Sequence, residues 1–225
     1  MAVVEDQRRP GRALAVFAIA VVIGHHLGTL LKPLGTVGPT EWADWVDLVV
    51  PLAVLGSAVW VLAATRARPR EWLLFAVGAM TYAQGHGVHL GANSVSNAEP
   101  TGRARDAAHL WDEVVGHYIW YAGLAAVVLA LVLALTRVGS PARVGLAGYL
   151  LAGLFGLTWT TNAIEGGTVP LSAAVAVGLV VLAFRRRTAT ASPTVLVAYG
   201  LSLTLLVVWG VWHRGFPQFS ELGWI

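Results

Sequence analysis

Apolar stretches of roughly twenty residues, each free of Asp, Glu, Lys and Arg, recur along the whole chain. A helix of that length crosses the hydrocarbon core of a bilayer, which is about 30 Å thick. Only 12% of the residues are charged and 56% are hydrophobic, whereas about 25% of the residues in soluble domains are charged. The sequence therefore predicts an all-α integral membrane protein.

Short polar connections separate these stretches, and we predict that each stretch forms one transmembrane helix of a bundle. No long linker marks off a second domain, so residues 1–225 are expected to form a single helical domain. Such a chain would be a multi-pass protein of the cell membrane. The predicted spans are 13–34, 45–65, 71–92, 113–136, 144–165, 169–184 and 194–213.

The basic residues are distributed unequally between the two sides that seven spans would define. The side that holds the N-terminus has eleven of them, and the other side has four. The positive-inside rule therefore predicts a cytoplasmic N-terminus and an external C-terminus. The eleven are Arg8, Arg9, Arg12, Arg66, Arg68, Arg70, Arg137, Arg143, Arg185, Arg186 and Arg187, and the four are Lys32, Arg103, Arg105 and Arg214.

All seven histidines fall in the outer half of the predicted membrane region or in its outer loops. At 1.5 Å per residue, for example, His86 lies about 22 Å along its helix from Glu71 at the cytoplasmic end. Carboxylates gather at the same depth, and ionisable groups there are costly unless they face the bundle interior, pair with each other or bind an ion. The histidines are His25, His26, His86, His89, His109, His117 and His213.

Imidazole and carboxylate groups from several helices at one depth are the ligands expected of a zinc-type site. We predict His86, His89 and His117 as metal ligands, with His109 or His26 as substitutes. Residues 86 and 89 share a helix face, and 109, 113 and 117 share another if that helix begins by His109.

Further polar residues at this depth complete the predicted site. Glu113 or Asp112 would act as general base or as an additional ligand. Glu165 would be a partner of a ligand or a second carboxylate ligand. Asn93, Asn97 and Asn162 would hold a substrate head group or orient the ligands.

This pattern favours a metal-dependent hydrolase that acts on a lipid or lipid-linked substrate at the outer membrane face. Three alternatives remain open at this point: a cation or proton transporter or sensor, a haem b electron carrier with two histidine ligands, and a structural membrane protein. The histidines could also bond to loop backbone, and the helix dipole alone could explain Asp112 and Glu113.

Cysteine-based sites are excluded, and binding of nucleic acid is disfavoured. The chain has no cysteine, which excludes disulfides, thiolate metal sites and iron–sulfur clusters. The net charge is +3, and its basic residues lie mainly in the predicted loops on one side of the membrane. This placement indicates orientation in a membrane and not nucleic-acid binding. The sequence leaves the oligomeric state open.

Overall fold

A computed structural model describes residues 2–99, 101–138, 144–189 and 191–224, and nearly all of its ordered elements are helices. Arg143, one of the basic residues used to predict orientation, lies outside this described part. The helices are α1 (Ala2–Leu31), α2 (Trp42–Asp47), α3 (Val50–Ala64), α4 (Pro69–Ala98), α5 (Arg103–His109), α6 (His117–Arg137), α7 (Leu146–Glu165), α8 (Val169–Arg185) and α9 (Ser192–His213).

Three short elements complete the fold. A 3-10 turn, η1 (Lys32–Leu34), ends the first helix, and a small hairpin of β1 (Thr36–Val37) and β2 (Thr40–Glu41) leads into α2. The segment η2 (Leu110–Gly116) is a π-helix that joins α5 to α6 without a break. Each predicted span thus contains helix, and the all-α prediction is confirmed.

The helix boundaries differ from the predicted spans in two informative places. The predicted span 45–65 is interrupted between α2 and α3, where Pro51 occupies the first turn of α3 and has no backbone N–H to donate to the carbonyl of Asp47 in the preceding turn. Conversely, α4 continues six residues beyond the predicted end at 92, through the polar sequence up to Ala98. The polar tail of this helix is therefore ordered and not a frayed loop.

Four helical segments of the described chain are long and apolar enough to cross a bilayer: Arg9–Leu34, Trp42–Ala64, Arg103–Arg137 and Ser192–His213. Helix α8 is apolar but shorter. Leu52, Leu146 and Val211 are each at least 74% exposed on the outside of the bundle, as expected of side chains that face lipid. These features fit insertion into a membrane, while the count of seven spans and the orientation stay predictions.

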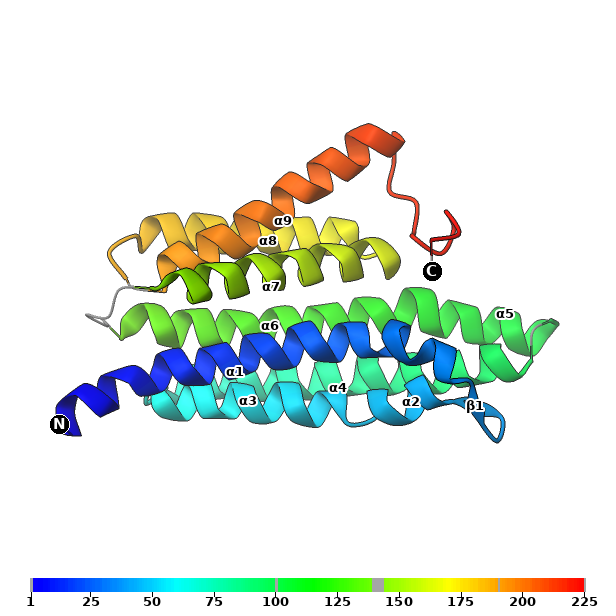
Figure 1. The fold of residues 1–225 in the computed structure, drawn as a ribbon, viewed down its shortest axis with the longest axis horizontal. Coiled ribbons are helices and arrows are strands. Elements are labelled where there is room, and N and C mark those ends of the chain that lie inside the picture. Colours follow the sequence, from blue (N-terminus) through cyan, green and yellow to red (C-terminus); the bar gives the residue numbers. More distant parts are fainter. Residues whose placement is uncertain (1, 100, 139–143, 190, 225) are drawn as a thin grey trace.

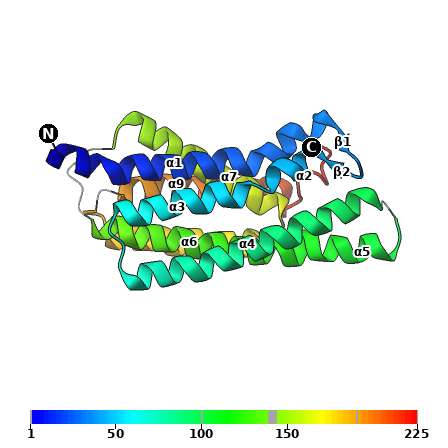
Figure 2. The same cartoon turned by 90° about the horizontal axis from the view of Figure 1, so that it is seen from below.

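The helices run side by side along one long axis, with α6 near the centre (Figures 1 and 2). Helix α4 packs on α6, α1 packs on α3 and α7, and α9 packs on α7 and α8. Figure 1 also shows the C-terminal half of α9 inclined away from the other helices, after which the chain turns back toward them. The side chains of Val127, Ala130 and Ala134 on α6 are fully buried in the core.

Glycines allow α4 and α6 to approach each other closely. A Cβ atom on Gly85 would lie 2.2 Å from the backbone nitrogen of Trp120, and one on Gly123 would lie 2.1 Å from that of Tyr82. Side chains at these positions would therefore force the two helices apart. Lipid is as apolar as the helix surfaces, so the hydrophobic effect does not drive helices together within a membrane. Close packing between small residues contributes to helix association instead. This helix pair carries the residues of the candidate site.

Candidate metal centre

The π-helix determines which residues of the 110–117 segment share a face. In a π-helix, residues five apart stack along the axis, instead of the residues four apart that stack in an α-helix. Asp112 and His117 are five apart, and both are buried, with exposed fractions of 4% and 7%. The wider π-helical turn therefore places Asp112 beside His117, and Glu113 stays close to the same histidine.

Helix α4 brings His89 to the same point. A Cβ atom on Gly116 would lie 3.1 Å from the backbone nitrogen of His89 and 3.2 Å from its Cα, so glycine at 116 permits this approach. One potential ligand atom from each of His89, Asp112 and His117 lies within 4.8 Å of the others. These three side chains form a group that can hold a metal ion, and we call it the metal group.

The spacing within the metal group is close to that of a bound ion. Two ligands on one tetrahedral zinc, at about 2.0–2.2 Å each, lie roughly 3.4 Å apart, so a pair separated by 4.8 Å would close by roughly 1–1.5 Å on binding. The imidazole rings of His89 and His117 have centroids 4.7 Å apart. Small side-chain rotations are therefore enough to complete the site.

Neighbouring acceptors orient both histidines. Nδ1 of His89 contacts Oδ1 of Asp112, and Nδ1 of His117 lies 3.2 Å from the backbone oxygen of Glu113. If each Nδ1 carries the proton, each Nε2 is left as a lone-pair donor for a metal. Metal-bound histidines commonly donate their other N–H to a carboxylate or a backbone carbonyl in this way. Asp112 can thus serve either as a direct ligand or as the group that orients His89.

Trp120 forms the floor of the metal group. Its indole ring stacks on His89 with centroids 5.5 Å apart and lies 5.7 Å from the ring of His117. On its other side, the indole stacks on His25 at 5.1 Å. Sequence analysis did not single out this tryptophan, although its position three residues after His117 places both on one helix face.

Glu113, predicted as a general base, lies at the edge of the metal group. Its Oε2 atom is 3.8 Å from Nδ1 of His117, and its side chain is 32% exposed. It is thus close to the metal group and still accessible from outside the bundle. The structure brings four of the predicted site residues together: His89, Asp112, Glu113 and His117.

His86 was expected to be a ligand, but it turns toward a different helix. Its Nε2 atom lies 3.0 Å from the backbone oxygen of Asp47 and 3.3 Å from the carboxylate of the same residue. Its Nδ1 atom is buried with no hydrogen-bond partner among the described residues. His86 and His89 do share a helix face, with rings 6.3 Å apart, but Asp47 holds His86 outside the metal group.

The predicted asparagines and the substitute histidines are also placed elsewhere. Asn93 donates to the carboxylate of Asp44 at 3.1 Å, and Asn162 donates to the backbone oxygen of Thr158 at 2.9 Å. His26 lies 3.2 Å from the hydroxyl of the same threonine. His109 and Asn97 are exposed to solvent. None of these five side chains belongs to the metal group.

Glu165 binds the C-terminal tail and not the metal group. Its Oε2 atom accepts hydrogen bonds from the backbone nitrogens of Phe219 at 2.7 Å and Ser220 at 3.3 Å. The tail also reaches the candidate base, since Nε2 of Gln218 lies 3.4 Å from Oε2 of Glu113. The segment after α9 therefore folds back to the edge of the site, as its course in Figure 1 shows.

A haem with His89 and His117 as its two axial ligands does not fit this arrangement. Two axial histidines must stand on opposite faces of the macrocycle. Here the rings of His89 and His117 pack almost directly against each other, and Trp120 covers the side toward the membrane interior. The space suits a single small ion.

No protein-family model matches the sequence, and neither the curated proteins nor the solved structures include a significant match to the chain. The geometry of the metal group is therefore the basis for a proposed function.

Proposed function

We propose that the chain is a membrane metalloenzyme whose metal group binds one divalent cation at the outer membrane face, and that it hydrolyses a lipid or lipid-linked substrate. The convergence of His89, Asp112 and His117 from two helices carries this proposal. Two imidazoles and one carboxylate form a donor set that suits zinc, and a fourth position is left for water.

Glu113 supplies the second chemical element of the proposal. A bound zinc ion would lower the pKa of a coordinated water and polarise a substrate carbonyl or phosphoryl oxygen. Glu113 lies beside His117 and is partly exposed, so its carboxylate can accept the proton of an attacking water. The hydrogen bond from Gln218 leaves the other carboxylate oxygen available for this role.

The surface next to the metal group favours a lipid substrate. Leu110, Trp111 and Val114 of η2 are 48–52% exposed, and Tyr118 of α6 is 39% exposed. Apolar side chains of this size beside the metal group would let the acyl chain of a lipid remain in the membrane while its head group reaches the metal group.

The core beneath the site disfavours the transporter alternative. Below Trp120 and Tyr121, the buried side chains of α6 include Leu124, Val127 and Leu131. A cation pathway would need polar groups through this depth, and the described part of α6 buries only apolar residues and glycine from 123 to 135.

The proposal can be tested by hydrolysis of labelled ester and phosphoester lipids by the purified protein in nanodiscs. We expect turnover that disappears after chelation and returns with zinc. Glu113→Gln should lower the rate by about 10²–10⁴-fold, the usual contribution of a general base, while zinc stays bound.

Glu99→Gln is the matched control, because Glu99 is an exposed carboxylate near the outer end of α4 and outside the site. Its rate should equal that of the wild type. Equal rates for Glu113→Gln and Glu99→Gln, or turnover that survives chelation, would exclude a metal-dependent hydrolase of the kind proposed.

A further inference from the structure

A cavity lies at the opposite end of the bundle from the metal group. It has a volume of about 530 Å³, lies between α1, α6, α7 and α9, and is open on one side. Its walls are apolar, with Phe17 and Ala18 from α1, Leu131 and Leu135 from α6, Phe155 from α7 and Val195 from α9. Binding sites for small molecules commonly have volumes of about 300–1,000 Å³.

Arg12 is the single charged side chain among the described residues that line this cavity. It is exposed to solvent and makes no hydrogen bond or ion pair with any other described residue. The cavity thus combines a deep apolar interior with one cation near the end of the bundle. This distribution matches an amphiphile that has an anionic head and an apolar tail.

The length of the cavity matches one membrane leaflet. Along α6 its wall runs from Val128 to Val138, which at 1.5 Å per residue is roughly 15 Å. Half of the hydrocarbon core, the depth that one acyl chain covers, is also about 15 Å. An acyl chain that enters beside Arg12 would therefore fill the cavity to its inner end.

From these observations we propose that the cavity binds one acyl chain of an acidic phospholipid, with the phosphate held by Arg12. Arginine is suited to this contact, because its planar guanidinium can form two hydrogen bonds with one phosphate. The predicted orientation agrees with this occupant, since it places Arg12 at the cytoplasmic leaflet, where acidic lipids attract basic residues.

This lipid site is separate from the metal group. On α6, His117 and the first lining residue, Val128, are eleven residues apart, or about 16 Å along the helix. The two sites share no residue. A lipid bound here is therefore a structural or regulatory ligand and not the substrate of the proposed reaction.

Native mass spectrometry can test this proposal on the full chain purified in detergent. The protein is offered equal amounts of phosphatidylglycerol and phosphatidylcholine with identical acyl chains. We expect the wild type to retain one phosphatidylglycerol in preference to phosphatidylcholine. Arg12→Gln should lower this preference by about fivefold, the contribution expected of one basic residue at a membrane surface.

Arg9→Gln is the matched control for charge, because Arg9 is exposed on the same helix and does not line the cavity. Ala15→Phe would fill the cavity and should reduce retention of both lipids, whereas Val16→Phe, at a 42% exposed position outside the cavity, should not. Circular dichroism and gel filtration verify that each variant is folded.

Three results would overturn the proposal. The first is an equal loss of preference in Arg12→Gln and Arg9→Gln. The second is full retention of lipid by folded Ala15→Phe. The third is a retained fatty acid or neutral lipid in place of the acidic phospholipid.

Discussion

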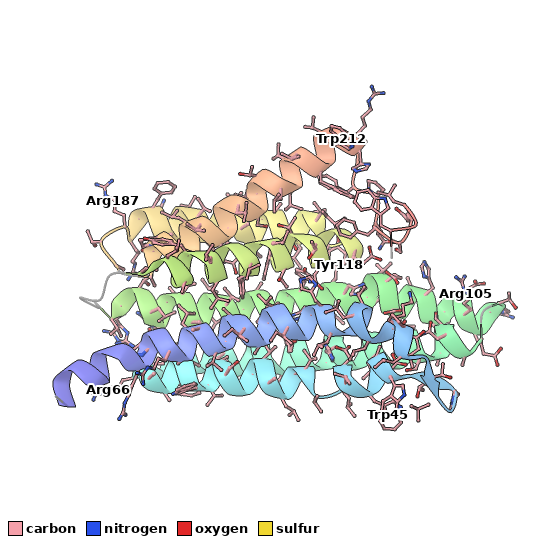
Figure 3. The ribbon with its side chains drawn as sticks, viewed as in Figure 1. Trp45, Arg66, Arg105, Tyr118, Arg187 and Trp212 are labelled. Atoms are coloured by element: carbon pink, nitrogen blue, oxygen red, sulfur yellow. The ribbon has the colours of Figure 1, made fainter. Side chains whose placement is uncertain are left out.

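The two ends of the α4–α6 helix pair use charged and polar residues in opposite ways. At one end, Glu71 of α4 is 1% exposed and accepts a hydrogen bond from Arg137 of α6 at 3.1 Å. At the other end, the same helices contribute His89 and His117 to the metal group. Figure 3 shows this division along the long axis, with Arg66 and Arg187 toward one end and Trp45 and Arg105 toward the other.

The difference between the ends lies in which polar atoms are already paired. Arg137 also donates to the backbone oxygens of Thr65 at 3.4 Å and Arg66 at 3.1 Å, so its guanidinium is used to close the helix ends. The metal group leaves the Nε2 atoms of two histidines available and has an accessible carboxylate beside it. Paired charges stabilise one end, and donor atoms that remain available make the other end suitable for binding an ion.

The largest effect is expected from breaking the ion pair at the first end. Arg137→Ala would leave the buried carboxylate of Glu71 without its countercharge, which typically costs about 3–5 kcal/mol of stability. The thermal unfolding midpoint in detergent should fall accordingly, and zinc binding to the folded protein should not change.

Arg185→Ala is the control for this variant, because it removes an exposed arginine from the end of α8. Its unfolding midpoint should match the wild type. A similar loss in both variants would indicate a general effect of charge and would contradict a specific role of the Glu71–Arg137 pair.

The next effect tests the glycine contact between the helices. Gly85→Ala would place a methyl group 2.2 Å from the backbone nitrogen of Trp120. Overpacking of this kind costs about 1–3 kcal/mol, and the displaced helix should also weaken zinc binding. Unlike Arg137→Ala, this variant should therefore lower both stability and metal affinity, measured by thermal unfolding and titration calorimetry.

Gly87→Ala provides the comparison, since no atom lies within 4 Å of a Cβ at that exposed position. Alanine favours the helix by about 1 kcal/mol over glycine, so this protein should be at least as stable as the wild type. Destabilisation by Gly87→Ala to the same extent would argue against the close approach at Gly85.

The smallest effect concerns the C-terminal tail beside the site. Glu165→Gln keeps one acceptor oxygen but removes the charge that receives the backbone N–H groups of Phe219 and Ser220. Charge-assisted hydrogen bonds are roughly twice as strong as neutral ones, so the tail should lose about 1 kcal/mol. Hydrogen exchange in residues 215–224 should become faster.

Zinc binding by Glu165→Gln should equal that of the wild type, because Glu165 lies outside the metal group. A matching loss of zinc would instead return Glu165 to the ligand role that the sequence suggested.

The sequence was sufficient to predict the helices and the polar end of the bundle. Apolar length depends only on local composition, so the helices could be predicted directly, while the count of seven spans and the depth of the histidines in a membrane stay predictions. The role of individual glycines is clear only from the packing, because Gly85 meets α6 whereas Gly87 and Gly91 face open space.

The exact membership of the metal group could not be read in the same way. It depends on a π-helix, which brings Asp112 as well as Glu113 beside His117 and makes Asp112 the member of the metal group. It also depends on α2, because Asp47 draws His86 away from the other histidines. Both effects arise from contacts between helices and leave little trace in the spacing of residues along one helix.

The most direct test of the central claim is the metal content of the purified protein, measured by mass spectrometry of the elements after dialysis against zinc. If the metal group binds zinc, we expect about one zinc ion per chain in the wild type and in His86→Ala. We expect His89→Ala and His117→Ala to retain none. Equal zinc content in all four proteins, or none in the wild type, would contradict that claim.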